Sequence, residues 1–349
     1  MAKAKRRPRA KRKRAAKKNA AKYQIAYRTK RGRMVIGRIE AALESRALAK
    51  LRGKTNLIFT SPPFPLVRKK RYGNETGKAY IKWLEKLAPR LCGMLAPNGS
   101  VVIEIGNSWE PGVPVMSTLG LEALLAFKRA GKLNLCQQII CHNPARLPSP
   151  AQWVNVKRER LKDSFTHVWW MSRSKHPKAD NSRVLLPYSE HMKGLLKSQK
   201  YNAGVRPSGH VISKKGFLKN HGGAISANVI DLAENNALPE ALMKFSGTSA
   251  DNKYREYCEA RGYETHPARM QMGLASFFIQ FLTEPGDVVL DPFGGSNTTG
   301  FAAESLRRKW ISIEASKEYA LGSRGRFTKN KKKKLARRKK RGKAKAKGG

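Results

Sequence analysis

The sequence predicts an α/β protein built on a parallel, doubly wound sheet, and two observations carry this prediction. Short apolar runs of strand length alternate with longer segments of helical periodicity, which is the pattern of a parallel sheet covered by helices. Several of these apolar runs end directly at Pro-rich or Gly-rich turns, where a strand must stop. With 349 residues and 40% hydrophobic side chains, the chain is long and apolar enough to bury such a core.

The first half of the core is expected to contain four strands and two helices. The expected strands are compact apolar runs at Thr55–Thr60, Ser100–Ile105, Leu135–Cys141 and Phe165–Met171. The expected helices have apolar residues at helical spacing and lie at Tyr80–Met94 and Thr118–Ala130. Because proline cannot donate an intrahelical hydrogen bond, Pro89 is expected to kink or divide the first helix.

The second half repeats the pattern after an interruption. Residues 173–262 have weaker periodicity and many Gly, Lys and Asn residues, so an inserted recognition lobe is expected there. A helix, a strand, a helix and a strand are then expected in turn at Gln271–Leu282, Asp287–Leu290, Thr298–Leu306 and Trp310–Ile313.

Both ends of the chain are strongly basic. Residues 1–33 and 324–349 hold 31 of the 72 Lys and Arg residues and no acidic residue, and the whole chain has a formal net charge of +48. Such blocks repel themselves and cannot bury apolar area, so both ends are expected to be disordered tails. Two interpretations stay open for them: solubilising tails, or electrostatic arms for a polyanion such as nucleic acid.

The composition argues against several classes of protein. No apolar run approaches the roughly 18 residues of a membrane span, and the N-terminus lacks the apolar segment of a secretory signal. Four scattered cysteines form no disulfide framework, which indicates a reducing compartment. Cys136, Cys141 and His142 could ligate a metal, but they lack a second ligand pair. Buried thiols are expected there instead, and no metal site is predicted.

A glycine-rich loop follows the strand expected at Asp287–Leu290 and opens the next helix. Open α/β sheets bind ligands at such junctions, where free N–H groups favour a carboxylate or phosphate. The loop matches neither a Walker loop nor G-x-G-x-x-G, and a plain tight connection stays an alternative. Glu314 lies 23 residues after Asp291, about where an acid reaches the ribose of an adenosine cofactor. The candidate ligand-binding residues of the loop are Asp291, Pro292, Phe293, Gly294, Gly295, Ser296 and Thr298.

A second loop, Ser61-Pro62-Pro63-Phe64, directly follows the strand expected at Thr55–Thr60. The Pro-Pro step holds the backbone stiff and extended, so it presents the Ser61 hydroxyl and nearby carbonyls as fixed acceptors. Phe64 supplies a ring for stacking. Acceptors beside an aromatic ring suit the exocyclic amino group of a planar base, although a plain loop is the alternative interpretation.

Together, these two loops resemble those of the amino-group DNA methyltransferases that use S-adenosylmethionine. The family's Asp-Pro-Phe-Gly loop binds the cofactor, and its Ser-Pro-Pro-Phe-type loop binds the target amine. Thr60 followed by Ser-Pro-Pro-Phe looks like the variant associated with N4-cytosine methylation. The catalytic loop precedes the cofactor loop, which is similar to the β-class order of motifs. Further stretches that resemble family motifs lie at 104–109, 206–210, 222–225 and 266–269.

The resemblance implies a Rossmann-like methyltransferase sheet with circularly permuted motifs and an inserted recognition lobe. It also implies S-adenosylmethionine as cofactor, bound by the loop at 291–298 together with Glu314 and His266. Catalysis is implied for the four residues Ser61, Pro62, Pro63 and Phe64. The family commonly has Gly-Asp near the adenine, where this chain has Gly37-Arg38 and Glu40 two residues on.

The implied reaction is methyl transfer to N4 of a cytosine that has flipped out of duplex DNA. Two alternatives stay open. The same fold could methylate N6 of adenine, or an amide of RNA or protein. The chain could also be a basic DNA-binding protein without catalytic activity.

Under this interpretation the chain divides into five parts. They are a basic tail at 1–33, a catalytic part at 34–172, a target-recognition region at 173–262, a cofactor-binding part at 263–323 and a second tail at 324–349. The residues expected to contact DNA are Lys157, Arg158, Arg160, Arg206, Lys214 and Lys215, with a solvated surface as the alternative.

Double-stranded DNA is the expected partner, and a cognate restriction endonuclease is a candidate partner. No membrane association is expected, and the protein is expected to be a monomer or weak dimer. The expected location is the cytoplasm near the nucleoid in a prokaryote, or the nucleus in a eukaryote.

Overall fold

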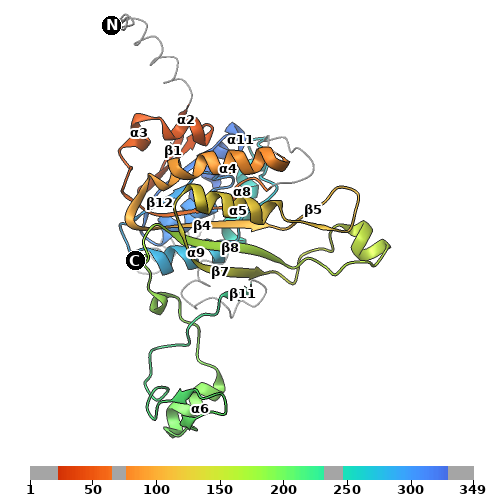
Figure 1. Cartoon of the computed structure of the whole chain (residues 1–349). Helices are drawn as coiled ribbons and strands as arrows, with labels where there is room; N and C mark the ends of the chain where they lie inside the picture. The colour runs from red at the N-terminus through yellow and green to blue at the C-terminus, as the bar shows by residue number, and fades with distance from the viewer. Residues whose placement is uncertain (1–22, 65–75, 232–246, 329–349) are drawn as a thin grey trace, which may run out of the picture.

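A nine-stranded sheet lies at the centre of the molecule, with helices on both faces (Figure 1). The computed structural model describes residues 23–64, 76–231 and 247–328. Its strands are β1 (Gln24–Arg28), β2 (Gly32–Ile36), β3 (Thr55–Thr60), β4 (Leu95–Gly106), β5 (Ser108–Trp109), β6 (Met116–Ser117), β7 (Asn134–His142), β8 (Phe165–Ser172), β9 (Gly204–Val205), β10 (Val211–Ile212), β11 (Val229–Asp231), β12 (Val288–Asp291) and β13 (Lys309–Glu314).

The helices of the described residues are mostly short. The α-helices are α2 (Ile39–Leu43), α3 (Arg46–Ala49), α4 (Gly77–Cys92), α5 (Leu119–Ala130), α6 (Glu190–Ser198), α8 (Gly247–Glu259), α9 (Met272–Leu282), α10 (Thr298–Ser305) and α11 (Lys317–Gly322). The other helical turns are the π-turn η1 (Gln152–Val156) and the 3₁₀ turns η2 (Asn181–Val184) and η4 (Ser323–Phe327).

The α/β class is confirmed, and the sheet is mostly parallel. Its order is β1-β2-β13-β12-β3-β4-β8-β7-β11. In this order, each neighbouring pair from β2 through β13, β12 and β3 to β4 is parallel. The pair of β7 and β11 is parallel as well. The strand β8, however, is antiparallel to both of its neighbours. Its reversed direction follows from the connection, because β7 and β8 are joined by a loop without a crossover helix.

Two apolar cores sandwich the sheet, because neighbouring residues of a strand point to opposite faces. On β3, Ile58 packs with the core beneath α4 and α5, whereas Leu57 and Phe59 pack with the core beneath α9 and α10. This double burial explains why the central strands are continuous apolar runs in the sequence.

The expected division of the first helix at Pro89 is wrong. The helix α4 runs from Gly77 to Cys92 with Pro89 inside it. Leu87, Ala88 and Leu91 around the proline are all buried in the core. Their packing holds the backbone helical although proline contributes no N–H.

The predicted tail boundaries at residues 33 and 324 are also wrong. The segment 24–36 is a β-hairpin on the edge of the sheet, with Tyr27 buried. At the other end, the Arg326 guanidinium is fully buried and donates from Nε to the carbonyl of Ser296 over 2.6 Å. A count of charges cannot detect a strand or an arginine that is paired inside the fold. The remaining predicted tail residues, 1–22 and 329–349, lie outside the described residues.

Residues 185–226 form an outlying lobe that hangs beyond the β11 edge of the sheet (Figure 1). It contains α6 and the hairpin β9–β10, and none of the residues of α6 is buried. A bridge between Leu186 and Ala224 closes its base. The predicted recognition region at 173–262 is therefore not one unit, because β11 joins the main sheet and α8 packs on η4.

Candidate active site

A cavity of about 350 Å³ opens at the carboxyl edge of the parallel strands. Its lining residues follow the sheet order, from Gly37 after β2, through Glu314 on β13, Asp291 on β12 and Ser61 after β3, to Glu104 on β4. This volume falls within the usual range of ligand pockets, roughly 300–1,000 Å³. The edge is also where open α/β sheets bind ligands.

The glycine-rich loop is fixed by close backbone contacts. The N–H of Gly294 donates to the carbonyl of Ile313 over 2.7 Å, and a Cβ on Gly294 would lie 3.0 Å from the Cβ of Ser312. Asn297 has a left-handed φ of 57°, and its side chain accepts a hydrogen bond from the N–H of Gly300. An asparagine is therefore adequate at this position, because it tolerates left-handed backbone and caps α10.

Asp291 connects the two loops that the sequence singled out. Its Oδ1 accepts hydrogen bonds from Thr60 Oγ1 over 2.8 Å and from the N–H of Phe293 over 3.0 Å. Burial raises the pKa of the Asp291 carboxyl to about 6, against the lowering effect of these donors. Since Thr60 directly precedes Ser61, this contact links the glycine-rich loop to the Ser61 loop.

Glu314 is buried at the end of β13, and both of its carboxylate oxygens already accept backbone hydrogen bonds. Oε2 accepts from the N–H of Gly295 and Oε1 from the N–H of Ser316, each over 2.8 Å. Burial raises the pKa of this carboxyl. Each oxygen keeps a second lone pair, so the position also suits a ligand with paired hydroxyl groups.

His266, predicted to belong to the cofactor site, lies against the glycine-rich loop. A Cβ on Gly295 would lie 3.1 Å from His266 Nε2, and the imidazole packs edge-on against Tyr319 with ring centres 4.8 Å apart. The N–H of His266 donates to the Tyr254 hydroxyl over 2.7 Å. These contacts place the ring on the wall of the cavity.

The end of the cavity beside β2 contains Glu40 and Trp83, of which only Glu40 was predicted from the sequence. Glu40, the expected substitute for the family's acid, lines the cavity and accepts from Trp83 Nε1 over 2.8 Å. Trp83 also packs against Phe293, with ring centres 5.6 Å apart. The position of Trp83 at the cavity was not predicted, because the sequence of α4 has the pattern of an ordinary amphipathic helix. A planar ligand could stack between the side chains at this end.

At the other end of the cavity, Ser61 is hydrogen-bonded to a carboxylate. The partner is Glu104 on β4, which also accepts from Thr166 Oγ1 over 3.1 Å. Burial raises the pKa of the Glu104 carboxyl, while these two hydrogen bonds and the charge of Arg146 act against the rise. Sequence reasoning assigned Glu104 no role, although a single acid in an apolar strand was a visible signal.

The rest of the second loop lines the same end. Pro62, Pro63 and Phe64 all border the cavity. The ring of Phe64 lies so close to Gly106 that a Cβ there would be 2.6 Å from its Cε2. Glycine at the end of β4 therefore leaves the space that the ring occupies.

Three further lining residues come from β7 and the loop after it: Cys141, Asn143 and Arg146. The first is a thiol, but burial and the nearby Glu104 raise its pKa to about 12. It stays protonated near neutral pH, which does not suit a nucleophile. Asn143 and Arg146 offer hydrogen-bond donors to a polar ligand.

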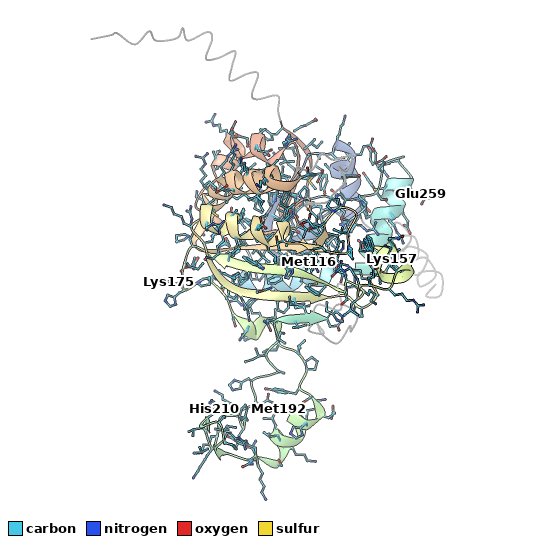
Figure 2. All side chains as sticks on the ribbon, turned by 45° about the vertical axis from the view of Figure 1, so that its right-hand side comes forward. Met116, Lys157, Lys175, Met192, His210 and Glu259 are labelled. Carbon is cyan, nitrogen blue, oxygen red and sulfur yellow. The ribbon has the colours of Figure 1, made fainter. Side chains whose placement is uncertain are left out.

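The basic residues predicted to contact DNA lie in two separate places, and none of them lines the cavity. Lys157, Arg158 and Arg160 lie in the loop between β7 and β8, on the main body. Figure 2 shows Lys157 there, far from the lobe that carries Met192 and His210. The outlying lobe holds the other three, Arg206, Lys214 and Lys215. Most of the six are exposed, so a solvated surface is still an alternative for them.

No group of three or more His, Cys, Asp or Glu side chains in residues 23–64, 76–231 and 247–328 could hold a metal ion. Within the same ranges, no helix has the length and apolar character to cross a membrane.

Comparison with known proteins agrees with this geometry. The N6/N4 methylase family, described as DNA methylase, matches residues 55–323. The chain belongs to this DNA methylase family. The matched range includes the Ser61 loop, Glu104, the outlying lobe and the glycine-rich loop.

Three comparisons with individual proteins are informative. The Type II methyltransferase M.PvuII from Proteus hauseri is 39% identical over 307 residues, which cover 87% of this chain and 86% of that protein. A solved structure titled PvuII DNA methyltransferase (cytosine-N4-specific) superposes with a TM-score of 0.66 at 33% identity, covering 89% of this chain and 91% of that one. The DNA adenine methyltransferase YhdJ of Escherichia coli strain K12 is 38% identical over only 91 residues, 26% of this chain and 31% of that protein.

Proposed function

We propose that this DNA methylase transfers a methyl group from S-adenosylmethionine to the exocyclic N4 of cytosine in duplex DNA. The observation that carries the proposal is the Ser61–Glu104 pair at one end of a cavity, joined through Thr60 to Asp291 on the neighbouring strand β12. The cytosine-N4 specificity named for the similar PvuII structure supports the choice of base.

The end of the cavity between β2 and β12 fits the cofactor. Glu314 would accept hydrogen bonds from the ribose, and Glu40 with Trp83 would border the adenine. Asp291 and the loop from Pro292 would surround the methionine portion, which carries positive charge on sulfur and on its amino group. When bound, S-adenosylmethionine supplies an electrophilic methyl group.

The other end fits a flipped base. A cytosine inside a duplex cannot present its N4 to a buried methyl group, so the base must leave the stack. Ser61 Oγ and the Pro62 carbonyl can accept hydrogen bonds from the amino group. These bonds strengthen as the nitrogen becomes pyramidal and more positive, so they stabilise the transition state more than the ground state.

Glu104 gives the reaction a route for the proton that the nitrogen must lose. The carboxylate accepts from Ser61, so a proton leaving N4 can pass to the Ser61 oxygen while the Ser61 proton passes to Glu104. The raised pKa of Glu104 makes its carboxylate a stronger base than an exposed glutamate. Phe64 would stack on the base, a contact worth about 1–3 kcal/mol.

The basic residues of the loop between β7 and β8 and of the outlying lobe would hold the duplex through its phosphates. Because the relative M.PvuII is a type II methyltransferase from a bacterium, we also propose a cytoplasmic location and a cognate restriction endonuclease as partner.

Mass spectrometry of nucleosides from DNA of a methylation-deficient host expressing the protein tests the product. N4-methylcytosine is the expected product, and 5-methylcytosine should not form because the pKa of Cys141 is raised. N6-methyladenine as the main product would overturn the choice of base. Ser61→Ala should lower turnover about 10²–10³-fold, the effect of one preorganised hydrogen bond, with cofactor affinity unchanged. Full activity of that variant would overturn the mechanism.

A further inference from the structure

The loop between β7 and β8, residues 143–164, is a fixed arm beside the cavity. At its base, the N–H of Asn143 donates to the carbonyl of Ser164 over 2.7 Å. Arg146, which lines the cavity, donates to Asp163 over 3.3 Å. The arm extends with β5 beyond the end of the sheet (Figure 1). Its base is therefore part of the cavity wall.

The outer part of the arm is held as well. The Arg160 guanidinium lies over the ring of Trp109, 3.1 Å from its centre. Asp163 accepts a second hydrogen bond from Asn107 Nδ2 over 2.7 Å. The side chains of Arg160 and Asp163, on either side of Leu161, thus contact the segment that follows β4. The strand β4 carries Glu104.

Leu161 itself is 91% exposed, and Leu147 on the same arm is 81% exposed. Single exposed leucines are common on protein surfaces. These two, however, occupy special positions. Leu147 directly follows Arg146, and Leu161 lies two residues before Asp163, the partner of Arg146. Two exposed apolar side chains therefore lie beside Arg146, which lines the cavity, and near its partner Asp163.

The charge around Leu147 and Leu161 indicates the kind of partner that this surface binds. Residues 143–164 contain five basic and two acidic side chains. Next to Leu161 stand Arg160, on the ring of Trp109, and Lys162, which donates to the carbonyl of Pro144 over 2.7 Å. Their positive charge favours an anionic partner, and the phosphates of duplex DNA are that partner in the proposed function. Proteins that kink or open DNA insert an apolar side chain between bases while basic neighbours hold the backbone. An exposed apolar residue between two cations has that arrangement.

We propose that Leu161 is the wedge that enters the base stack of the duplex at the place from which the target nucleotide is extruded. The inserted side chain fills the gap, so the flipped state is stabilised while the base lies in the cavity. This inference rests on the proposed function, because it assumes that a base must leave the duplex.

The test compares Leu161→Ala with wild type on two oligonucleotide duplexes that carry the methylated site found by sequencing DNA from expressing cells. In one duplex the target cytosine is paired with guanine, and in the other it stands opposite an abasic position, where extrusion is easier. Leu161→Ala should reduce the single-turnover methylation rate roughly tenfold or more on the paired duplex. On the abasic duplex it should be within about twofold of wild type.

Leu125→Ala is the matched control, because Leu125 is an exposed leucine on α5, outside the arm and outside the cavity lining. It should behave as wild type on both duplexes. Both variants should keep the wild-type Tm and cofactor affinity. A wild-type rate for Leu161→Ala on the paired duplex would overturn the inference, and so would an equal loss on both duplexes.

A second readout is independent of the methylated product. With 2-aminopurine in place of the base next to the target cytosine, which stays paired with guanine, the fluorescence of the probe should increase when wild type binds and should not increase when Leu161→Ala binds. A wild-type increase in the variant overturns the inference. If wild type unstacks the probe but makes no N4-methylcytosine, the proposed methylation is wrong, whereas the inference about Leu161 is retained.

Discussion

The cavity and the outlying lobe are built in opposite ways. Around the cavity, buried carboxylates are fixed by hydrogen bonds, as Asp291 is by Thr60 and Glu314 is by the N–H of Gly295. In the lobe, no residue of α6 is buried, and Val205 on β9 is 74% exposed. Methyl transfer needs geometry that exists before the substrate arrives. Under the proposed function, a lobe that binds DNA can complete its contacts when the duplex arrives.

The two regions also differ in charge. Residues 185–226 contain seven basic residues and one acidic residue. The cavity wall contains four carboxylates, from Glu40, Glu104, Asp291 and Glu314, beside arginine side chains. The lobe therefore suits a polyanion, whereas the cavity suits a small ligand with positive centres. The predictions that follow separate the two regions experimentally.

Removal of the lobe should have the largest effect on methylation and almost none on the cofactor site. Leu186 and Ala224 exchange two backbone hydrogen bonds of 2.8 Å, so a short turn can replace residues 187–223 between them. Methylation at the cognate site should fall on the order of 10³-fold, a typical ratio of specific to non-specific binding. Calorimetry should show unchanged cofactor affinity. A large loss of cofactor affinity would contradict the separation of the two regions.

Glu314→Ala should weaken cofactor binding by about 1.5–3 kcal/mol, the range for hydrogen bonds to a charged group. It should also lower the free energy of unfolding by roughly 1–3 kcal/mol, because the N–H groups of Gly295 and Ser316 lose their acceptor. Calorimetric titration and urea unfolding measure the two effects. Glu318→Ala is the control, since Glu318 is exposed on α11 and outside the cavity lining. Unchanged cofactor affinity in Glu314→Ala would remove this residue from the site.

Some parts of the cavity could be predicted from the sequence. Both loops of the cavity were predictable, because each directly follows an apolar strand and contains residues with restricted or unusual backbone. Their contact through Thr60 and Asp291 was predictable only in general terms, since parallel strands end at one edge.

Other parts of the site and the fold depend on long-range contacts that no local pattern records. Glu104 faces the cavity because of the register of β4 against β8, which sets the side of the sheet to which it points. Trp83 meets Glu40 because α4 packs beside α2. The edge hairpin β1–β2 was concealed by its basic residues, of which Arg28 and Lys30 are exposed, whereas Met34 and Val35 are buried.

The affinity for S-adenosylmethionine should depend on pH through Asp291. Its pKa is raised to about 6, and only the ionised carboxylate attracts the positive charge of the cofactor. Affinity should therefore be constant above about pH 7 and fall as the pH drops through 6, by about tenfold at pH 5. Asp291→Asn should bind more weakly at pH 7 and show a smaller change between pH 7 and pH 5. The same steep decrease in Asp291→Asn would assign the titration to Glu314, whose pKa is also raised.

Removal of a single cation from the lobe should have the smallest effect. It should change the salt dependence of DNA binding and leave the choice of site unchanged. Lys214→Ala should weaken binding of any duplex less than tenfold at 0.1 M salt and reduce the slope of log affinity against log salt by about 0.9, the value for one phosphate contact. Lys54→Ala is the matched control, because this exposed lysine lies before β3, at the edge of the sheet opposite the cavity. Fluorescence anisotropy at several salt concentrations measures both slopes. If Lys214→Ala left the slope unchanged, or if it altered which site is methylated, the lobe would not be binding the duplex simply through phosphate contacts at this residue.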